Sequence, residues 1–273
     1  PHKGDMGSSF LGLNANKRSI AVNLKSPDGV EIVKNLAAEA DVLVENFKTG
    51  DMERFGLGYD DLKALNDRLV YTSVAAFGRK GPKAKALGYE ALLQAYSGVM
   101  GITGEPGGMP VRCGVSFLDM GTGVMAALAT VTALFRREFT GTGGKCVTSL
   151  LGTSLGLMSN TVANFLQHGY MPERLGTAHP QVVPYQVYPT KDSFIFIASA
   201  NQNLFERLCQ AIGHKDMIDD PRFESNATRV ENREACLKLI FDRLATIDTA
   251  PLMEMLDAHG VPYSAVNTLE SLW

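Results

Sequence analysis

Apolar positions along the first half of the chain follow two periodicities. Short segments rich in apolar and β-branched residues predict strands at residues 19–24, 41–47, 69–77 and 145–151, and the almost continuous apolar core of 41–47 is typical of a buried parallel strand. Stretches with apolar residues three or four positions apart predict helices at residues 28–40, 50–56 and 59–66. This alternation predicts a doubly wound α/β domain with right-handed crossovers. Ligands of such domains bind outside the carboxyl ends of the strands.

The pattern changes further along the chain. Residues 88–137 are mostly helical around a Gly/Pro-rich loop, and their longest helix is expected at 119–138. Another helix is expected at 152–168. A hairpin with Lys191-Asp192 at its turn then precedes helices at residues 202–212, 231–246 and 250–259. We therefore expect a large Rossmann-like domain at 1–169, a Pro-rich linker at 170–185 and a small α+β domain at 186–273.

Composition excludes several functional classes. A net charge of -3 and a pI of about 6.0 give no global basic field to favour nucleic acid or an anionic membrane. No apolar run without charges reaches the ~20 residues of a membrane span. The four cysteines form no CxxC pair, which argues against a zinc site or a disulfide framework and indicates a reducing, cytoplasmic compartment. The chain does not begin with methionine, so we expect a preceding segment, with any organellar targeting signal.

Residues 121–126 (GTGVMA) fit the dinucleotide-binding pattern G-x-G-x-x-A at the start of a helix. The pattern needs a strand just before it and an acidic residue ending a second strand. Here the helix runs into Arg136-Arg137 instead, so close helix packing is favoured over a nucleotide site.

Asp119 lies between an apolar segment and an apolar helix. Asp is a preferred N-cap residue, so a structural cap explains it on local grounds. A carboxylate at a helix start among glycines would also be ionised and reachable, as a nucleophile requires. Gly121 would let a bulky substrate approach the backbone, and a nearby N–H could stabilise an oxyanion. Both interpretations remain open at this point.

Basic residues gather in the first third of the chain, several in loops at the expected ligand edge. A solvated charged face and a polyphosphate site both explain such a series. Its members are Lys17, Arg18, Lys25, Lys48, Arg54, Arg79, Lys80, Lys83 and Lys85.

Seven segments in the same order resemble the class III CoA-transferases, the CaiB/BaiF or formyl-CoA transferase-like family. They are NKRSIAVNLKSPDG, ADVLVENFKTGDMERFGLGYDDLKALN, LVYTSVAAFGRKGP, LGYEALLQAYSGVMGITGEP, PVRCGVSFLDMGTGVMAALATVTALF, RLGTAHPQVVPYQVY and DDPRFESNATRVENR. The resemblance implies a Rossmann-like large domain, a smaller domain and an interlocked homodimer. It also implies that the N- and C-terminal segments of the family are absent from this chain.

The resemblance implies roles for individual residues. Asp119 matches the catalytic aspartate, and Tyr89 and Glu90 match active-site positions. A basic contact of some members is replaced by Leu87. The coenzyme A contacts match Val22, Asn23, Leu24, Lys25, Asn46, Phe47 and Arg54, the last at the nucleotide phosphates. No permanently bound cofactor and no metal is implied, because coenzyme A enters as a thioester substrate.

The implied reaction moves coenzyme A from an acyl-CoA to a carboxylic acid through an aspartyl mixed anhydride and an aspartyl-CoA thioester. We expect a small dicarboxylate acceptor and a succinyl-CoA donor. One alternative is α-methylacyl-CoA racemase chemistry, but racemases carry a histidine where this chain has Tyr89, and tyrosine is a poor base near neutral pH. The other alternative is a non-catalytic CoA-binding fragment.

Overall fold

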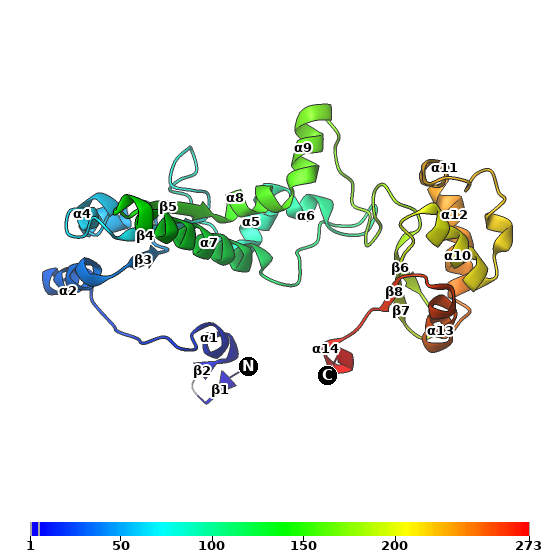
Figure 1. The fold of residues 1–273 in the computed structure, drawn as a ribbon, viewed down its shortest axis with the longest axis horizontal. Coiled ribbons are helices and arrows are strands. Elements are labelled where there is room, and N and C mark those ends of the chain that lie inside the picture. The colour runs from blue at the N-terminus through cyan, green and yellow to red at the C-terminus, as the bar shows by residue number, and fades with distance from the viewer. Residues whose placement is uncertain (1, 5, 273) are drawn as a thin grey trace. The chain divides into compact units, whose positions relative to one another are not determined.

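The computed structural model describes residues 2–4 and 6–272, which form two compact units (Figure 1). The first unit comprises Pro1–Val99 and Arg112–Tyr170, and the second comprises Met100–Val111 and Met171–Trp273. Each unit has its own buried apolar core. The expected domain limits and the linker at 170–185 stay a prediction.

A three-stranded parallel sheet organises the first unit. Its strands are β3 (Val42–Glu45), β4 (Val70–Ala75) and β5 (Gly144–Ser149), in the order β3-β4-β5. The expected α/β class with a parallel sheet is therefore confirmed, as are three of the four strands expected here. The connecting helices also lie where periodicity placed them, namely α2 (Pro27–Glu39), α3 (Asp51–Arg54) and α4 (Tyr59–Lys63).

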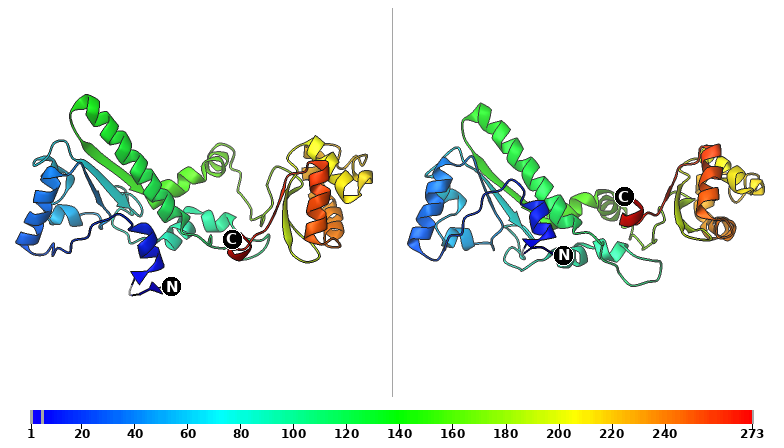
Figure 2. Two further views of the ribbon diagram at one scale, coloured as in Figure 1. Left: turned by 60° about the horizontal axis from the view of Figure 1, so that its bottom comes forward. Right: turned by 90° about the horizontal axis from the view of Figure 1, so that it is seen from below.

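Helices cover both faces of this sheet (Figure 2). On one face, Leu43 and Tyr71 pack with side chains of α2, α3 and α4, including the fully buried Leu62. On the other face lies α7 (Phe117–Thr140), whose Thr130 hydroxyl is 2.6 Å from that of Thr72. Successive residues of a strand point to opposite faces of the sheet. Tyr71 therefore packs against the α2, α3 and α4 side, and Thr72 contacts α7 on the other side.

The direction of α7 follows from the hydrogen bonds of Arg137 near its C-terminal end. The guanidinium donates to the carboxylate of Asp41 at 2.7 Å and to the carbonyl of Arg68 at 3.0 Å. Asp41 and Arg68 precede β3 and β4, so this end of α7 lies at the amino ends of the strands. The start of α7, with Asp119, therefore lies toward the carboxyl ends, where α/β sheets bind ligands.

The strand expected at residues 19–24 is wrong. These residues form no regular element, and Ile20 is 67% exposed. A strand exists through hydrogen bonds to a neighbouring strand, and in the described part of the chain β3 pairs with β4 alone and forms the sheet edge. An apolar run therefore did not suffice without a strand beside it.

Two further helices, α5 (Glu90–Ser97) and α8 (Leu150–Leu157), pack against α7. α6 (Val99–Ile102) follows α5 along the chain, and α9 (Ser159–His168) follows α8, so the single helix expected at 152–168 is divided at Met158. Leu93 of α5, Leu118 of α7 and Leu150 of α8 form a small buried cluster. The N-terminal β1 (His2–Lys3), β2 (Met6–Gly7) and α1 (Ser8–Leu13) were not expected from the pattern.

The second unit is an antiparallel sheet packed against helices. The expected hairpin is confirmed as β6 (Tyr185–Pro189) and β7 (Phe194–Ala198), and β8 (Tyr263–Ala265) pairs with β7. Its helical elements are α10 (Gln202–Ile212), η1 (Lys215–Met217), α11 (Asn226–Glu231), α12 (Arg233–Leu244), α13 (Thr249–His259) and α14 (Leu269–Leu272). Arg229 is fully buried in this unit and donates to the carbonyls of Val183 and Phe223.

By length and hydropathy alone α7 could cross a membrane, which the sequence analysis missed. Two features favour a sheet-covering role instead. Its Thr130 and Ala129 contact Thr72 of β4 and Cys146 of β5, and Arg137 ties its end to the loops before the sheet. A helix that covers a sheet in a globular protein can pass the same length and hydropathy test. We therefore describe α7 as part of the first unit.

Candidate active site

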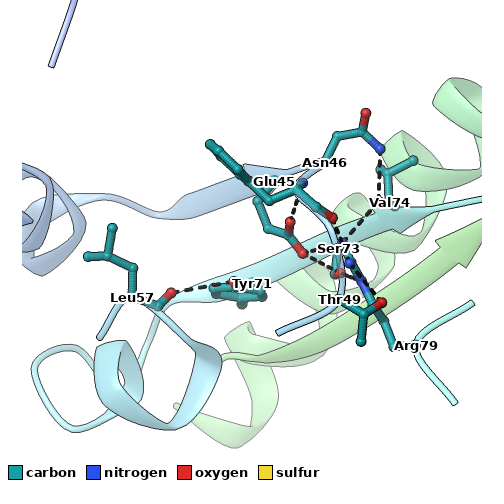
Figure 3. Close-up of polar contacts among 9 residues, drawn as sticks. Glu45, Asn46, Thr49, Leu57, Tyr71, Ser73, Val74 and Arg79 are labelled. Atoms are coloured by element: carbon teal, nitrogen blue, oxygen red, sulfur yellow. Dashed lines mark hydrogen bonds and ion pairs between the residues drawn. The ribbon is translucent and has the colours of Figure 1, made fainter. Parts of the chain in front are cut away.

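The loop after β3 is tied to the end of β4 by one arginine (Figure 3). The Nε of Arg79 donates to the Ser73 hydroxyl at 2.6 Å, and Nη2 donates to the Glu45 carboxylate at 2.6 Å and to the Val74 carbonyl at 3.0 Å. Its Nη1 donates to the Phe47 carbonyl at 2.7 Å. Arg79 is therefore neither a solvated surface charge nor a free cation for a phosphate group.

The same network orients Asn46 and Phe47. The backbone N–H of Phe47 donates to Glu45 at 2.8 Å, and the Asn46 side-chain amide donates to the Val74 carbonyl at 2.9 Å. The Ser73 hydroxyl also donates to Glu45, which is almost completely buried. Both predicted coenzyme A contacts of this loop are thus held at the carboxyl ends of β3 and β4.

A surface pocket joins this loop to the segment that leads to Tyr89. Residues 46–49, the end of β4 and residues 84–88 line it, so Asn46 and Phe47 face Leu87 and Gly88 across one cavity. The Phe47 ring makes an edge contact with the Phe55 ring, with centroids 6.2 Å apart. The structure therefore places the predicted nucleotide contacts and the predicted active-site segment at the same edge of the sheet.

Arg54 and Leu24 belong to the helical side of the sheet that α2, α3 and α4 form. Arg54 is mostly exposed and pairs with Asp51 at 3.1 Å. An exposed pair of this kind contributes about 0–1 kcal/mol, so a phosphate could replace Asp51 at little cost. Leu24 packs against the core beside Phe55, and the Asn23 carbonyl lies against Gly29, where a side chain would not fit. In the described residues no hydrogen bond joins residues 22–25 to the loop after β3.

Asp119 is in the first turn of α7 but is not its N-cap. The N-cap is Ser116, so the local cap interpretation of Asp119 is wrong by three positions. The helix dipole favours a negative charge at this place. Partial burial and the neighbouring Glu90 carboxylate act in the opposite direction and raise the pKa of Asp119 above its ordinary value. The carboxylate is exposed on the surface and more basic than a free Asp side chain.

Glu90 is held in place by two residues that the sequence analysis did not identify. The Gln94 amide donates to one of its oxygens at 2.5 Å, and Arg112 Nε lies 3.6 Å from the other. Gln94 is fully buried and its carbonyl oxygen also accepts the backbone N–H of Cys113 at 2.9 Å. Gln94 therefore fixes both Glu90 and the loop that leads to Asp119. The spacing of four residues between Glu90 and Gln94 was a visible signal for their contact.

Tyr89 and Gly121 have simpler surroundings. Tyr89 is the N-cap residue of α5 and its side chain is 75% exposed. Gly121 lies in the second turn of α7, where a Cβ would be 3.2 Å from a methyl group of Thr153 in α8. The glycine therefore permits α7 and α8 to pack closely, in agreement with the packing interpretation of the G-x-G-x-x-A pattern. The unsatisfied N–H groups of a helix belong to its first turn, which is the turn of Asp119.

The fold and the site together define an α/β protein in which a carboxylate with a raised pKa, Asp119, lies at the start of a helix. This helix start lies toward the carboxyl ends of the parallel strands, where such sheets bind ligands. A family model described as CoA-transferase family III matches residues 1–273, and the chain belongs to this family. A CaiB/BaiF family protein from Brucella suis is 37% identical, with a TM-score of 0.83 over 95% of this chain and 68% of that one. A Mycobacterium tuberculosis structure is 26% identical, with a TM-score of 0.86 over 95% of this chain and 69% of that one.

Curated relatives agree with this assignment. A succinyl-CoA:glutarate CoA-transferase from Mus musculus is 38% identical over 97% of this chain and 61% of its own length. A succinate–glutarate CoA-transferase from Agrobacterium fabrum is 36% identical over 95% of this chain and 65% of its own length. The chain spans about three fifths of the length of the first of these relatives, so the activity of the whole protein is a matter for proposal.

Proposed function

We propose that the protein transfers coenzyme A from an acyl-CoA donor to a small dicarboxylic acid, with Asp119 as the nucleophile. The observation that best supports this role is the place of Asp119 in the first turn of α7, where burial and the neighbouring Glu90 carboxylate raise its pKa, in a chain that belongs to a family of CoA-transferases. A more basic carboxylate is a stronger nucleophile, provided that it is ionised. Coenzyme A is a substrate in this scheme and no permanent cofactor is required.

The proposed reaction has four acyl exchanges. An Asp119 oxygen attacks the donor carbonyl carbon, the C–S bond breaks, and a mixed anhydride and CoA thiolate form. The thiolate attacks the aspartyl carbon of the anhydride, which releases the donor acid and forms an aspartyl-CoA thioester. The acceptor carboxylate attacks this thioester and gives a second anhydride and thiolate. Attack of the thiolate on the acceptor acyl carbon forms the new acyl-CoA and frees Asp119.

The surroundings of Asp119 supply what these steps need. Each exchange passes through a tetrahedral oxyanion, and the unpaired N–H groups of the first turn of α7 are suitable donors. In this proposal Gly121 assists by close packing of α7 rather than by its own N–H, which lies one turn further along. Glu90 stays a charged neighbour that keeps Asp119 basic, and Tyr89 offers an exposed hydroxyl beside the acyl group.

We assign coenzyme A to the edge where β3 and β4 end. Asn46 and Phe47 border the pocket that leads to Gly88, and Arg54 is exposed at the end of α3 for the phosphates. Val22, Asn23, Leu24 and Lys25 would complete the nucleotide site, as the family resemblance implies. Relatives named for succinyl-CoA and glutarate, citramalate or mesaconate support a succinyl donor and a short dicarboxylate acceptor.

We also propose a homodimer. The resemblance implies one, and an apolar row on the outer side of α7 is consistent with a surface that another subunit covers. Its members, each at least 60% exposed, are Val124, Leu128, Val131, Phe135 and Phe139. Light scattering coupled to size exclusion would give twice the chain mass, whereas a monomer mass would contradict the proposal.

We place the protein in the cytoplasm. All four cysteines are free, and Cys209 and Cys236 are buried where burial raises each thiol pKa to about 12. Thiols without partners are typical of a reducing compartment. Fractionation of cells that express the protein would test this, and recovery in an oxidising compartment would contradict it.

Trapping the acyl intermediate tests the mechanism. The purified protein is incubated with succinyl-CoA, treated with hydroxylamine or borohydride, and digested for mass spectrometry. We expect a hydroxamate or a reduced side chain at Asp119. A matched control is Asp28, which also lies in the first turn of a helix and should stay unmodified. No adduct, together with deuterium exchange at the α carbon of an acyl-CoA, would instead support racemase chemistry.

A further inference from the structure

The Arg79 guanidinium uses all of its donors inside the protein. An arginine side chain has five N–H groups. Five acceptors surround them, namely Ser73 Oγ, the Phe47 and Val74 carbonyls, Thr49 Oγ1 at 3.3 Å and a Glu45 oxygen. Arg79 and Glu45 are 14% and 5% exposed at their side chains. No donor of Arg79 is therefore left for a phosphate group of a ligand.

These acceptors belong to β4, to the end of β3, where Glu45 lies, and to the loop after β3, and the bonds of Arg79 connect them (Figure 3). Ser73 and Val74 belong to β4, which the sheet already holds rigid through both neighbouring strands. Phe47 and Thr49 belong to the loop after β3, which has no pairing with another strand among the described residues. The guanidinium is planar and its donors have fixed directions, so it sets the position of the loop relative to β4.

We infer that Arg79, whose side chain also borders the pocket, is a positioning residue for coenzyme A binding, which acts by ordering residues 46–49 because its donors are already used inside the protein. The inference rests on the proposed coenzyme A site at Asn46 and Phe47. The backbone of Phe47 is bonded on both sides, with its N–H to Glu45 and its carbonyl to Arg79. Loss of the arginine removes the donor of the Phe47 carbonyl and leaves the Glu45 carboxylate buried without its cationic partner. The loop then no longer has a defined conformation.

The chain contains a matched control for this arginine. Arg137 is also nearly buried, pairs with Asp41 at 2.7 Å and with Glu138 at 4.0 Å, and donates to the Arg68 carbonyl before β4. It lies at the amino ends of the same strands, on the side of the sheet away from the proposed site. A merely structural role of Arg79 would give the Arg79 and Arg137 variants the same phenotype.

The experiment compares Arg79→Gln, Arg79→Lys and Arg137→Gln in the full chain. Calorimetric titration with coenzyme A gives Kd, and steady-state assays with succinyl-CoA give KM and kcat. We expect Arg79→Gln to raise Kd and KM by about tenfold to a hundredfold, as for a misplaced binding group, with a smaller change in kcat. Lysine should not restore binding because it lacks the planar fork. Arg137→Gln should lower the melting temperature and leave Kd unchanged.

Hydrogen exchange without ligand tests the positioning step by itself. We expect backbone amides of residues 46–50 to exchange faster in Arg79→Gln and to exchange as in the wild type in Arg137→Gln. Thr49→Val, which removes a single acceptor of Arg79, provides a milder variant if Arg79→Gln does not fold, and should show the same changes to a smaller degree. Unchanged exchange in this loop, or an unchanged Kd, would overturn the inference. A wild type that does not bind coenzyme A would instead refute the proposed function, and the exchange result would still decide whether Arg79 orders the loop.

Discussion

Replacing Gly88 by alanine should displace the proposed active-site segment. Gly88 lies directly before Tyr89 and Glu90, which begin α5. A Cβ at this position would be 2.4 Å from the Cβ of Ala76 and 2.7 Å from a methyl group of Leu93. Carbon atoms in contact prefer a separation of about 3.5–4.0 Å, so the distance between the added Cβ and the Ala76 Cβ must increase by about 1 Å. The backbone at residue 88 must therefore move, because the Ala76 methyl is fixed just beyond the end of β4.

The cost follows from these contacts. Forcing one methyl group into a packed site costs about 1–3 kcal/mol. In a unit of this size each kcal/mol lowers the melting temperature by about 2–4 °C, so we expect a fall of roughly 2–12 °C. A shift of about 1 Å in a group next to the reaction can reduce the rate by up to about a hundredfold. We therefore expect kcat with succinyl-CoA to fall by at least tenfold in protein that is still folded.

Gly156→Ala is the matched control. Gly156 lies within α8, is exposed, and an added Cβ would have nothing within 4 Å. Alanine favours a helix over glycine by about 1 kcal/mol, so this variant should melt at the same or a higher temperature and keep its activity. Calorimetric melting and the succinyl-CoA assay are run on both variants. If Gly88→Ala melts and turns over like the wild type, the packing of Gly88 does not position Tyr89 and Glu90, and the reasoning fails.

Three more predictions concern charge and burial. The pKa of Asp119 is raised by burial and, in addition, by the charge of Glu90. Glu90→Gln removes the second cause, so the acidic limb of the kcat/KM profile against pH should move to lower pH; an unmoved limb would contradict the assignment. A raised carboxyl pKa in the folded state means that stability is lost as pH rises through it, so Asp119→Asn should not lower, and should slightly raise, the melting temperature at pH 7 while abolishing transfer. Arg229→Gln leaves the Val183 and Phe223 carbonyls without their buried donor and should cost about 2–5 kcal/mol in urea unfolding, and a loss below 1 kcal/mol would refute that role.

The sequence pattern correctly predicted the strands that pair with a neighbouring strand in the described residues. β3, β4 and β5 were predicted and pair with one another in the sheet, and α10 was predicted with its observed bounds. The run at residues 19–24 has the same composition but no adjoining strand, and it stays irregular. Strand formation depends on a second segment in a way that helix formation does not, so local periodicity could not separate these cases.

The site was predicted in part, and the missing part has a physical cause. Asp119 and Glu90 were both named, but nothing in a spacing of 29 residues indicates that one carboxylate raises the pKa of the other. Arg79 was counted with exposed lysines, because a charge count does not reveal that Glu45, 34 positions earlier, lies opposite it. Contacts between segments far apart in sequence depend on the sheet topology, which a motif does not contain.

The raised pKa of Asp119, the proposed nucleophile, is therefore a property of the tertiary structure. Its place in the first turn of α7 would by itself lower its pKa through the helix dipole, and a capping carboxylate would keep that low value. Partial burial of the carboxylate, together with the charge of Glu90 from another helix, reverses the direction. Gln94 holds Glu90 and also the backbone of Cys113, so one buried amide sets the relative positions of the charged neighbour and the loop that leads to Asp119. A change at Gln94 should consequently alter the pH dependence of Asp119 without touching either carboxylate.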